Sequence, residues 1–269
     1  MTNFESEIFN DMISNSREIP LDGGVNFRDI GGYQSRDGRL VKWRKVLRSG
    51  HLSNLTDNDK TTLMNIGVNQ IHDLRRVEEQ NRQPSIDFGA KTINDYCLSI
   101  GSLSEFWETL SKGGLSGSSS HSLVVNGYKS CINEVAPAYR RFMHLILDNA
   151  EGVSLIHCAA GKDRTGLAAA LILAALDVPD ETIINDYLLT KVYFDTDNLI
   201  NIVEGHLRNS EVSFWEREWL EPYCSVHRDN IETFLLALKQ DYGSLDNYMN
   251  KALCFGESHR RLLRKVFLE

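Results

Sequence analysis

Positive charge is in short supply in this 269-residue chain, which has 29 lysine and arginine residues against 37 acidic residues. The formal net charge is −8 at pH 7. Nucleic-acid binders need clustered lysine and arginine for their phosphate contacts, so we expect no nucleic-acid partner. An anionic substrate would therefore have to be held by a local cationic pocket.

Long hydrophobic runs are also missing. The longest apolar run extends from Leu167 to Leu176 and ends at Asp177, which is about half the length that a bilayer-spanning helix needs. The N-terminal segment has no apolar core, so we expect no Sec-type signal peptide. We therefore predict no stable membrane insertion and a cytoplasmic location, with export by another route as the alternative.

Cysteine is sparse, and its spacing excludes a disulfide framework. An odd, scattered set without a CxxC pair indicates reduced thiols, most of them buried for packing, and leaves room for one reactive thiol. None of the eight histidines has metal-ligand spacing with a cysteine or another histidine, so we predict no metal and no other cofactor. The five cysteines are Cys97, Cys131, Cys158, Cys224 and Cys254.

The patterning predicts one main domain. Residues 1–20 are polar and lack clear periodicity, so we expect an N-terminal arm. Residues 21–269 then form a single domain, with a helical insertion or lid around 190–225. The segment 111–121 is rich in glycine and serine. These residues bury too little apolar surface to offset the conformational entropy lost on ordering, so we expect a flexible loop there.

Strand and helix patterns alternate along this domain. Such alternation implies an α/β fold, in which a central, mainly parallel sheet is flanked by helices and followed by a helical C-terminal extension. Strands are expected as short pieces within 25–46 and over 68–75, 91–98 and 153–158. Helices are expected over 56–66, from Pro137 to Gly152, over 165–176, from Pro179 onward and from Ile231 to Gly243.

The most informative segment is HCAAGKDRTG, His157 to Gly166, which lies between a predicted buried strand and a predicted buried helix. Ligands of open α/β sheets bind beyond the carboxyl ends of the strands. Cys158 and Arg164 bracket five residues, and a loop of this length at a helix N-terminus can form a nest of backbone N–H groups for a tetrahedral oxyanion. The candidate phosphate-binding positions within it are Ala159, Ala160, Gly161 and Lys162.

Arg164 and Cys158 give this loop its chemistry. The planar guanidinium can bind two phosphate oxygens at once, which a lysine could not match. The same positive field favours the thiolate of Cys158, which is the reactive form of the side chain. The alternative explanation is structural: a buried thiol, an exposed charged triplet and a helix cap coincide by chance.

Asp163 departs from a generic anion-binding loop. A carboxylate beside an incoming phosphate is repulsive unless it arrives protonated, and a protonated Asp163 could supply a proton to the leaving oxygen. Lys162 could offset its charge and add attraction for the substrate. We expect the hydroxyl of Thr165 to point back to the sulfur, and His157 to face the protein and orient the loop.

With these residues in place, HCAAGKDRTG resembles the signature loop of the cysteine-dependent protein tyrosine phosphatase superfamily. More narrowly, it resembles a bacterial family of tyrosine and lipid phosphatases, and the similarity extends over roughly residues 20 to 269. The resemblance implies a tyrosine-phosphatase-like fold. Other matching segments are NFRDIGG (26–32), LRSGHLSNLT (47–56), HDLR (72–75), DYLLT (186–190) and YCSVHRDNIETFLLALKQDYGSLDNYM (223–249).

The resemblance implies Cys158 as nucleophile, Arg164 as phosphate binder and Asp163 as general acid. Most of the superfamily place the acid on a separate Trp-Pro-Asp loop, and this chain has no such tripeptide. Asp73 is the rival for the acid, because DLR should end a neighbouring strand. Its alternative role is that of a structural partner for a loop arginine.

Three further residues are second choices for the wall of the pocket: Arg28, Asp29 and Arg48. The alternative for them is a buried salt-bridge network that braces the sheet.

The activity implied by the resemblance is metal-independent hydrolysis of phosphomonoesters through a phosphocysteine intermediate, with inorganic phosphate as the product ligand. Phosphotyrosine in proteins is the first expected substrate, with dual specificity as an extension. A phosphoinositide is the nearest rival, because Lys162 could meet a second phosphate. A hypothesis of another class is a thiol redox or sulfur-transfer protein, which leaves Arg164 and Asp163 without a role.

Overall fold

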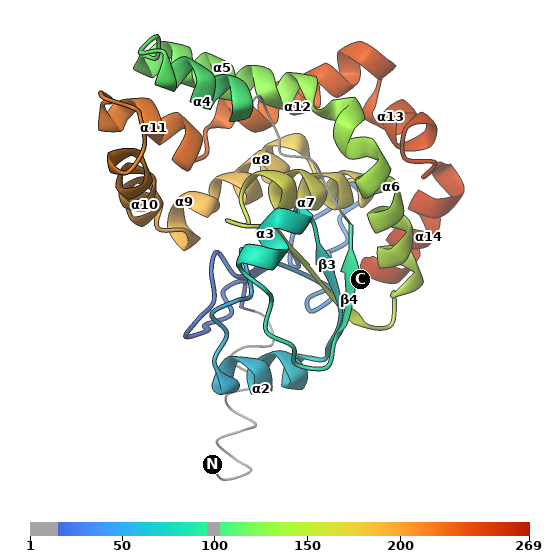
Figure 1. Cartoon of the computed structure of the whole chain (residues 1–269). Helices are drawn as coiled ribbons and strands as arrows, with labels where there is room; N and C mark the ends of the chain where they lie inside the picture. The colour runs from blue at the N-terminus through green and yellow to red at the C-terminus, as the bar shows by residue number, and fades with distance from the viewer. Residues whose placement is uncertain (1–15, 96–102) are drawn as a thin grey trace.

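The computed structural model describes residues 16–95 and 103–269, and a five-stranded sheet lies at its centre (Figure 1). The strand order is β1-β2-β5-β3-β4, in which β1 is antiparallel to β2 and all other pairs are parallel. The prediction of a mainly parallel sheet flanked by helices is confirmed. The strands are β1 (Arg28–Asp29), β2 (Val46–Ser49), β3 (Val68–Asp73), β4 (Lys91–Asn94) and β5 (Val153–His157).

The register of the sheet brings three strand ends into one row. His157 of β5 pairs with Ser49 of β2 on one side and with Asp73 of β3 on the other. Strand β5 is buried along its whole length, as its continuous apolar sequence predicts. The loop after β5 therefore emerges at the carboxyl edge of the sheet, between the ends of two neighbouring strands.

Side chains at alternate positions of the strands pack into two separate hydrophobic cores. Ile156 faces the larger core, together with Val46, while Leu155 and Leu47 face the smaller one. The smaller core is closed by α2 (Asp57–Ile66), which lies below the sheet in Figure 1. The larger core contains residues of α6 (Ile132–Asp148), α7 (Asp163–Ala175), α8 (Asp180–Leu188), α12 (Arg228–Tyr242), α13 (Leu245–Lys251) and α14 (Glu257–Phe267).

A third apolar cluster joins helices that are far apart in the sequence. Phe106 and Leu110 pack with Ile200 and Leu220, and α5 also contacts α11 and α12. In Figure 1 these helices lie above and to the left of the sheet. They are α4 (Leu103–Ser111), α5 (Gly117–Ser130), α10 (Thr196–Arg208) and α11 (Arg217–Cys224), and the short α9 (Thr190–Tyr193) directly precedes α10.

The prediction of a flexible loop over 111–121 is wrong from residue 117 onward. The serines cap a helix: the Ser116 side chain accepts a hydrogen bond from the backbone of Ser119, and the Ser119 hydroxyl bonds back to the backbone of Ser116. Such a capping box satisfies the amides at a helix start. Ser120 is fully buried and donates to the carbonyl of Trp219 on α11, so tertiary packing overrides the low-complexity composition.

Several boundaries also differ from the prediction. Helix α6 begins at Ile132 rather than Pro137 and ends at Asp148 rather than Gly152. Pro137 lacks the N–H that would bond to the carbonyl of Asn133, and because both residues are exposed, water can satisfy that carbonyl and the helix tolerates the proline. The segment 16–20 is not a loose arm, since Ile19 is buried in the smaller core; residues 1–15 lie outside the described residues. Strand β4 ends at Asn94, and the last residues of the predicted strand, 96–98, also lie outside them.

The local helix signals are confirmed. Thr56 and Asp59 form a capping box, and Gly67 ends α2 in the left-handed conformation. Gly243 ends α12 in the same way. Among the described residues, no helix combines the length and apolar character needed to cross a membrane.

Candidate active site

Cys158 and Arg164 lie at the two ends of the loop that connects β5 to α7. Cys158 directly follows the buried strand and is 3% exposed, while Arg164 lies in the first turn of α7. Gly161 has a φ of +69°, and a Cβ there would come within 2.4 Å of the carbonyl carbon of Ser49. Only glycine fits this close approach between the loop and β2.

Hydrogen bonds hold three successive loop carbonyls on the side of the 26–51 segment. The backbone N–H of His51 donates to the carbonyl of Ala159 at 2.9 Å. The side chains of Asn26 and Arg48 donate to the carbonyls of Ala160 and Gly161, at 3.1 and 2.9 Å. In a trans peptide the next N–H points the opposite way, so the amides of residues 160 to 162 point away from this segment. This is the arrangement that an anion-binding nest requires.

The predicted wall residues Arg28 and Arg48 belong to a buried network of hydrogen bonds that contains one ion pair. Nη1 of Arg48 lies 2.6 Å from Oδ2 of Asp186 on α8. Arg28 donates to the side chains of Asn26 and Thr190. Burial and the charge of Arg48 lower the pKa of Arg28 to about 9. Arg28 thus supports the loop through Asn26, which in turn holds the carbonyl of residue 160.

Asp29 also serves the backbone in this structure. Its carboxylate accepts hydrogen bonds from the backbone N–H of Gly31 and from both the backbone and the guanidinium of Arg44. Burial raises the pKa of Asp29, and these bonds to Arg44 and Gly31 oppose the rise. The structure therefore places Asp29 in the brace of the sheet.

The guanidinium of Arg164 is fixed by a carboxylate from α3 (Val77–Arg82). Its Nη1 and Nη2 each lie 2.7 Å from one carboxylate oxygen of Glu79. Nη1 also donates to the carbonyl of Leu74, at the end of β3. A fork-to-fork pair of this kind holds the plane of the guanidinium in one orientation.

Asp163 is the first residue of α7, and its side chain is 29% exposed. One carboxylate oxygen accepts a hydrogen bond from the hydroxyl of Tyr128 on α5. The other lies 3.0 Å from Nζ of Lys162. Lys162 donates further to the carbonyls of Tyr223 and Ser225 at the end of α11, so its ammonium is held inside the protein.

Asp73 is buried and engaged at the end of β3. Its two carboxylate oxygens accept hydrogen bonds from Nε and Nη2 of Arg75, at 2.9 and 2.8 Å. Nε2 of His157 lies 3.5 Å from the same carboxylate. His157 is completely buried, and burial lowers its pKa to about 4. The structure thus places Asp73 as the partner of a loop arginine and His157 as a neutral support beside the loop.

The predicted contact between Thr165 and the sulfur is not formed. The Thr165 hydroxyl is fully buried and has no hydrogen-bond partner within residues 16–95 and 103–269. A thiol sulfur is a weak acceptor, so Cys158 does not by itself fix the orientation of this hydroxyl.

Residues 19–269 match the model of the tyrosine phosphatase family. The chain belongs to this family. It is 27% identical to the triple specificity protein phosphatase PtpB of Mycobacterium tuberculosis over 271 residues, which cover 88% of this chain and 93% of that protein. It is 28% identical to a tyrosine-protein phosphatase of Nostoc commune over 149 residues, which cover 55% of this chain and 49% of that protein.

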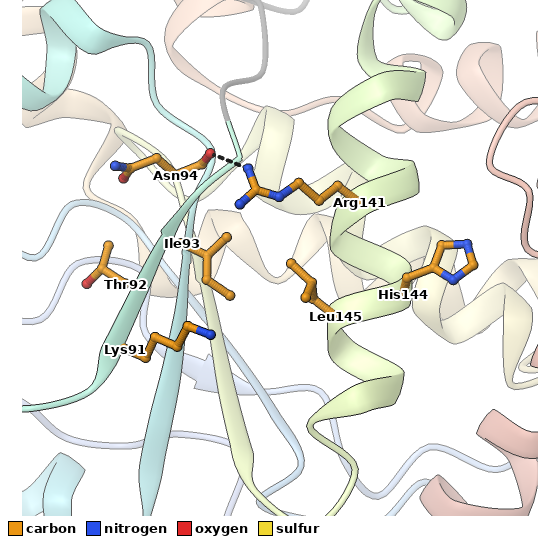
Figure 2. Close-up of a pocket in the computed structure, with 7 residues that line it drawn as sticks. All are labelled: Lys91, Thr92, Ile93, Asn94, Arg141, His144 and Leu145. Carbon is orange, nitrogen blue, oxygen red and sulfur yellow. Dashed lines mark hydrogen bonds between the residues drawn. The ribbon is translucent and has the colours of Figure 1, made fainter.

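A concave region of this tyrosine phosphatase family member lies away from the Cys158 loop. It has a volume of about 620 Å³ and lies between β4 and α6 (Figure 2). Arg141 donates to the carbonyl of Asn94 there, and His144 points away from the strand. None of its lining residues belongs to the loop. In the described part of the chain, no group of three or more histidine, cysteine, aspartate or glutamate side chains is arranged to hold a metal ion.

Sequence reasoning missed three residues that contact the loop: Glu79, Tyr128 and Asn26. Glu79 follows the DLR segment by four positions, within RVEEQNR, and a first-turn carboxylate after a strand end was the available signal. Tyr128 lies on a helix whose first residues were expected to form a loop, and it carries no local signal of its role.

Glu79→Gln is expected to lower kcat/KM by roughly 10- to 100-fold, because the guanidinium of Arg164 loses its charged partner and its fixed plane. It should also change the pH dependence of stability. Burial raises the pKa of Glu79, but the hydrogen bonds and charge of Arg164 outweigh this and hold the pKa at about 2, below the ordinary 4.5. This carboxylate therefore stabilises the fold above pH 4.5, and the contribution is lost as the pH falls toward 2.

Urea unfolding at a series of pH values measures this second effect. Between pH 4.5 and about 2, the wild-type free energy of unfolding should fall more steeply than that of Glu79→Gln. Glu78→Gln is the matched control, since Glu78 is the exposed neighbour on the same helix. Equal slopes for the Glu79→Gln and Glu78→Gln variants would contradict the role of the ion pair.

Proposed function

We propose that this chain hydrolyses phosphomonoesters, with phosphotyrosine in proteins as its preferred substrate, through a phosphocysteine formed at Cys158. The observation that carries the proposal is the loop itself. Three of its carbonyls are bonded to the 26–51 segment, and the arginine at its end is fixed by Glu79. Such a loop supplies aligned amides and a guanidinium to a tetrahedral dianion.

In the first step, the thiolate of Cys158 attacks phosphorus in line with the leaving oxygen. The S–P bond forms while the P–O bond to the tyrosine breaks. Asp163 gives its proton to the phenolic oxygen as it leaves. The loop amides and Arg164 stabilise the three equatorial oxygens, where charge is concentrated in the transition state.

In the second step, water attacks the phosphorus of the phosphocysteine. The carboxylate of Asp163 takes the proton of this water and so acts as general base. The S–P bond breaks, and inorganic phosphate and the thiolate of Cys158 are released. Asp163 is protonated again and the enzyme is ready for another substrate.

The contacts of Lys162 favour a phosphotyrosine over a phosphoinositide. A phosphoinositide would gain most from a cation that is available for a second phosphate. The ammonium of Lys162 is already bonded to two carbonyls of the α11 end and to Asp163, so it supports the loop rather than a second phosphate group.

The redox hypothesis receives no comparable support. Cys158 forms no disulfide with the other cysteines that the structure describes. A sulfur-transfer or thiol redox reaction gives no role to the Arg164–Glu79 pair or to the partly exposed Asp163. Phosphoryl transfer uses all of them.

Phosphate release from a panel of substrates tests the proposal. With EDTA present throughout, we expect kcat/KM for a phosphotyrosyl peptide to exceed that for a phosphoseryl peptide and a soluble phosphoinositide by at least about tenfold. EDTA should leave the rates unchanged. A higher kcat/KM for the phosphoinositide would reverse the substrate assignment, and the absence of phosphate release from every substrate would contradict the activity.

A further inference from the structure

A chain of hydrogen bonds extends from Asp163 into the interior of the protein. The hydroxyl of Tyr128 on α5 donates to Oδ1 of Asp163. The hydroxyl of Tyr187 on α8 lies 2.6 Å from that of Tyr128. Nδ2 of Asn230 on α12 lies 3.4 Å from the hydroxyl of Tyr187. Three helices remote in sequence thus meet behind one carboxylate.

The bond from Tyr128 to Asp163 sets the direction of the whole chain. A phenol has one proton to donate, so Tyr128 must accept from Tyr187. Tyr187 then has no proton left for Asn230 and accepts from its amide. All three donors therefore point toward the carboxylate of Asp163.

The packing around these side chains is close. Tyr128, Tyr187 and Asn230 are almost completely buried. A Cβ on Gly166 would lie 2.8 Å from Cδ2 of Tyr187. The glycine of the RTG segment therefore lets the Tyr187 ring lie directly on α7. The Tyr187 hydroxyl then reaches the hydroxyl of Tyr128, which in turn bonds to the carboxylate of Asp163.

Both phenols remain hydrogen-bond donors near neutral pH. Burial raises the pKa of Tyr128 well above its ordinary value, and the charge of Asp163 raises it further. Burial, with the charge of Asp163, raises the pKa of Tyr187 in the same way. Neither hydroxyl loses its proton near neutral pH.

The other ionisable groups around Asp163 come from its own loop and from α11. Lys162 contributes a positive charge at 3.0 Å, and the adjacent Arg164 turns its guanidinium to Glu79. On α11, burial raises the pKa of Tyr223 and raises that of Cys224 to about 12, so both are neutral. Tyr128 is thus the neutral donor that bonds directly to the carboxylate.

We propose that Tyr128 is a positioning residue, which holds Asp163 for proton transfer and, with Tyr187 and Asn230 behind it, stabilises the charge that the carboxylate gains when it gives up its proton. This inference rests on the proposed function, in which Asp163 is the acid. Dipoles that are aligned before the reaction stabilise developing charge without reorganisation. Their contribution is greatest when the leaving group is poor and the proton is fully transferred.

Tyr128→Phe tests the inference. For a phosphotyrosyl peptide, kcat should fall about tenfold with little change in KM, because the lost hydrogen bond is strongest to the charged carboxylate. The alkaline limb of the pH–rate profile should move about one unit higher, since a carboxylate without this donor keeps its proton to higher pH. Tyr139→Phe is the matched control, because it removes a buried hydroxyl that bonds to the carbonyl of Arg164. The alkaline limb of the pH–rate profile of this variant should stay where it is in the wild type.

A second variant keeps the hydroxyl at position 128 and should shift the alkaline limb in the opposite direction. Incorporating 3-fluorotyrosine at position 128 makes the phenol a stronger donor, so the alkaline limb should move to lower pH. If Tyr128→Phe lowers only the melting temperature and both limbs stay in place, the role of Tyr128 is overturned while Asp163 keeps its own. If Asp163→Asn retains the alkaline limb, the assignment of the acid fails, and the role of Tyr128 fails with it.

Discussion

Cys158→Ser should abolish turnover, with a loss of kcat on the order of 10⁴-fold or more. The serine hydroxyl at this position is not ionised near neutral pH, so the site has no reactive nucleophile. The loop amides and Arg164 can bind the phosphate group but cannot attack it. Steady-state release of phosphate from a phosphotyrosyl peptide measures the loss. Measurable multiple turnovers by the variant, with contaminating phosphatase removed, would rule out a phosphocysteine.

The same variant should still bind phosphate, because the loop contacts and Arg164 remain. Phosphate that binds only the folded state stabilises it by roughly 2.7 kcal/mol at one hundred times its Kd. Arg164→Lys is the paired variant and should lose most of this gain, since a lysine cannot hold Glu79 and phosphate in a forked geometry. Equal thermal shifts for wild type and Arg164→Lys would place the anion at another site.

The loop and its two flanking elements could be predicted because their signals are local. The apolar run of β5, the glycine at position 161 and the apolar α7 lie within about twenty-five residues of one another. The capping box at Thr56 and the left-handed glycine that ends α2 are local in the same sense. Backbone conformation at these points depends on nearby residues, so the sequence alone predicts it.

The partners of the loop could not be predicted because they come from distant segments. Glu79 reaches Arg164 across 85 positions, and Tyr128 reaches Asp163 across 35. The serine-rich start of α5 was misleading, since its composition resembles a linker while its caps and its packing on α11 order it. Arg28 and Asp29 of the NFRDIGG segment were candidates for the pocket wall, yet Asn26, the first residue of this segment, makes its direct contact with the loop.

Asp163→Asn should lower kcat most for substrates with a poor leaving group. General acid catalysis is typically worth roughly 10²- to 10⁴-fold, so a loss of this size is expected for phosphotyrosine or an alkyl phosphate. An activated aryl phosphate needs little protonation as it leaves, and its kcat should change much less. The alkaline limb of the wild-type pH–rate profile reports loss of the acid's proton, so it should flatten in the variant.

Asp73→Asn is the control that separates the two carboxylates. Asp73 is 2% exposed and holds Arg75 through both oxygens, so its loss should lower stability and loosen the end of β3. Removing one member of a buried pair leaves an uncompensated charge on Arg75, which costs about 3–5 kcal/mol. The alkaline limb should nevertheless survive, because in the proposed mechanism Asp163 carries the transferable proton. If Asp73→Asn erases that limb and Asp163→Asn retains it, the proton comes from the strand end rather than from the loop, and only the nucleophile and the phosphate-binding arginine keep their assignments.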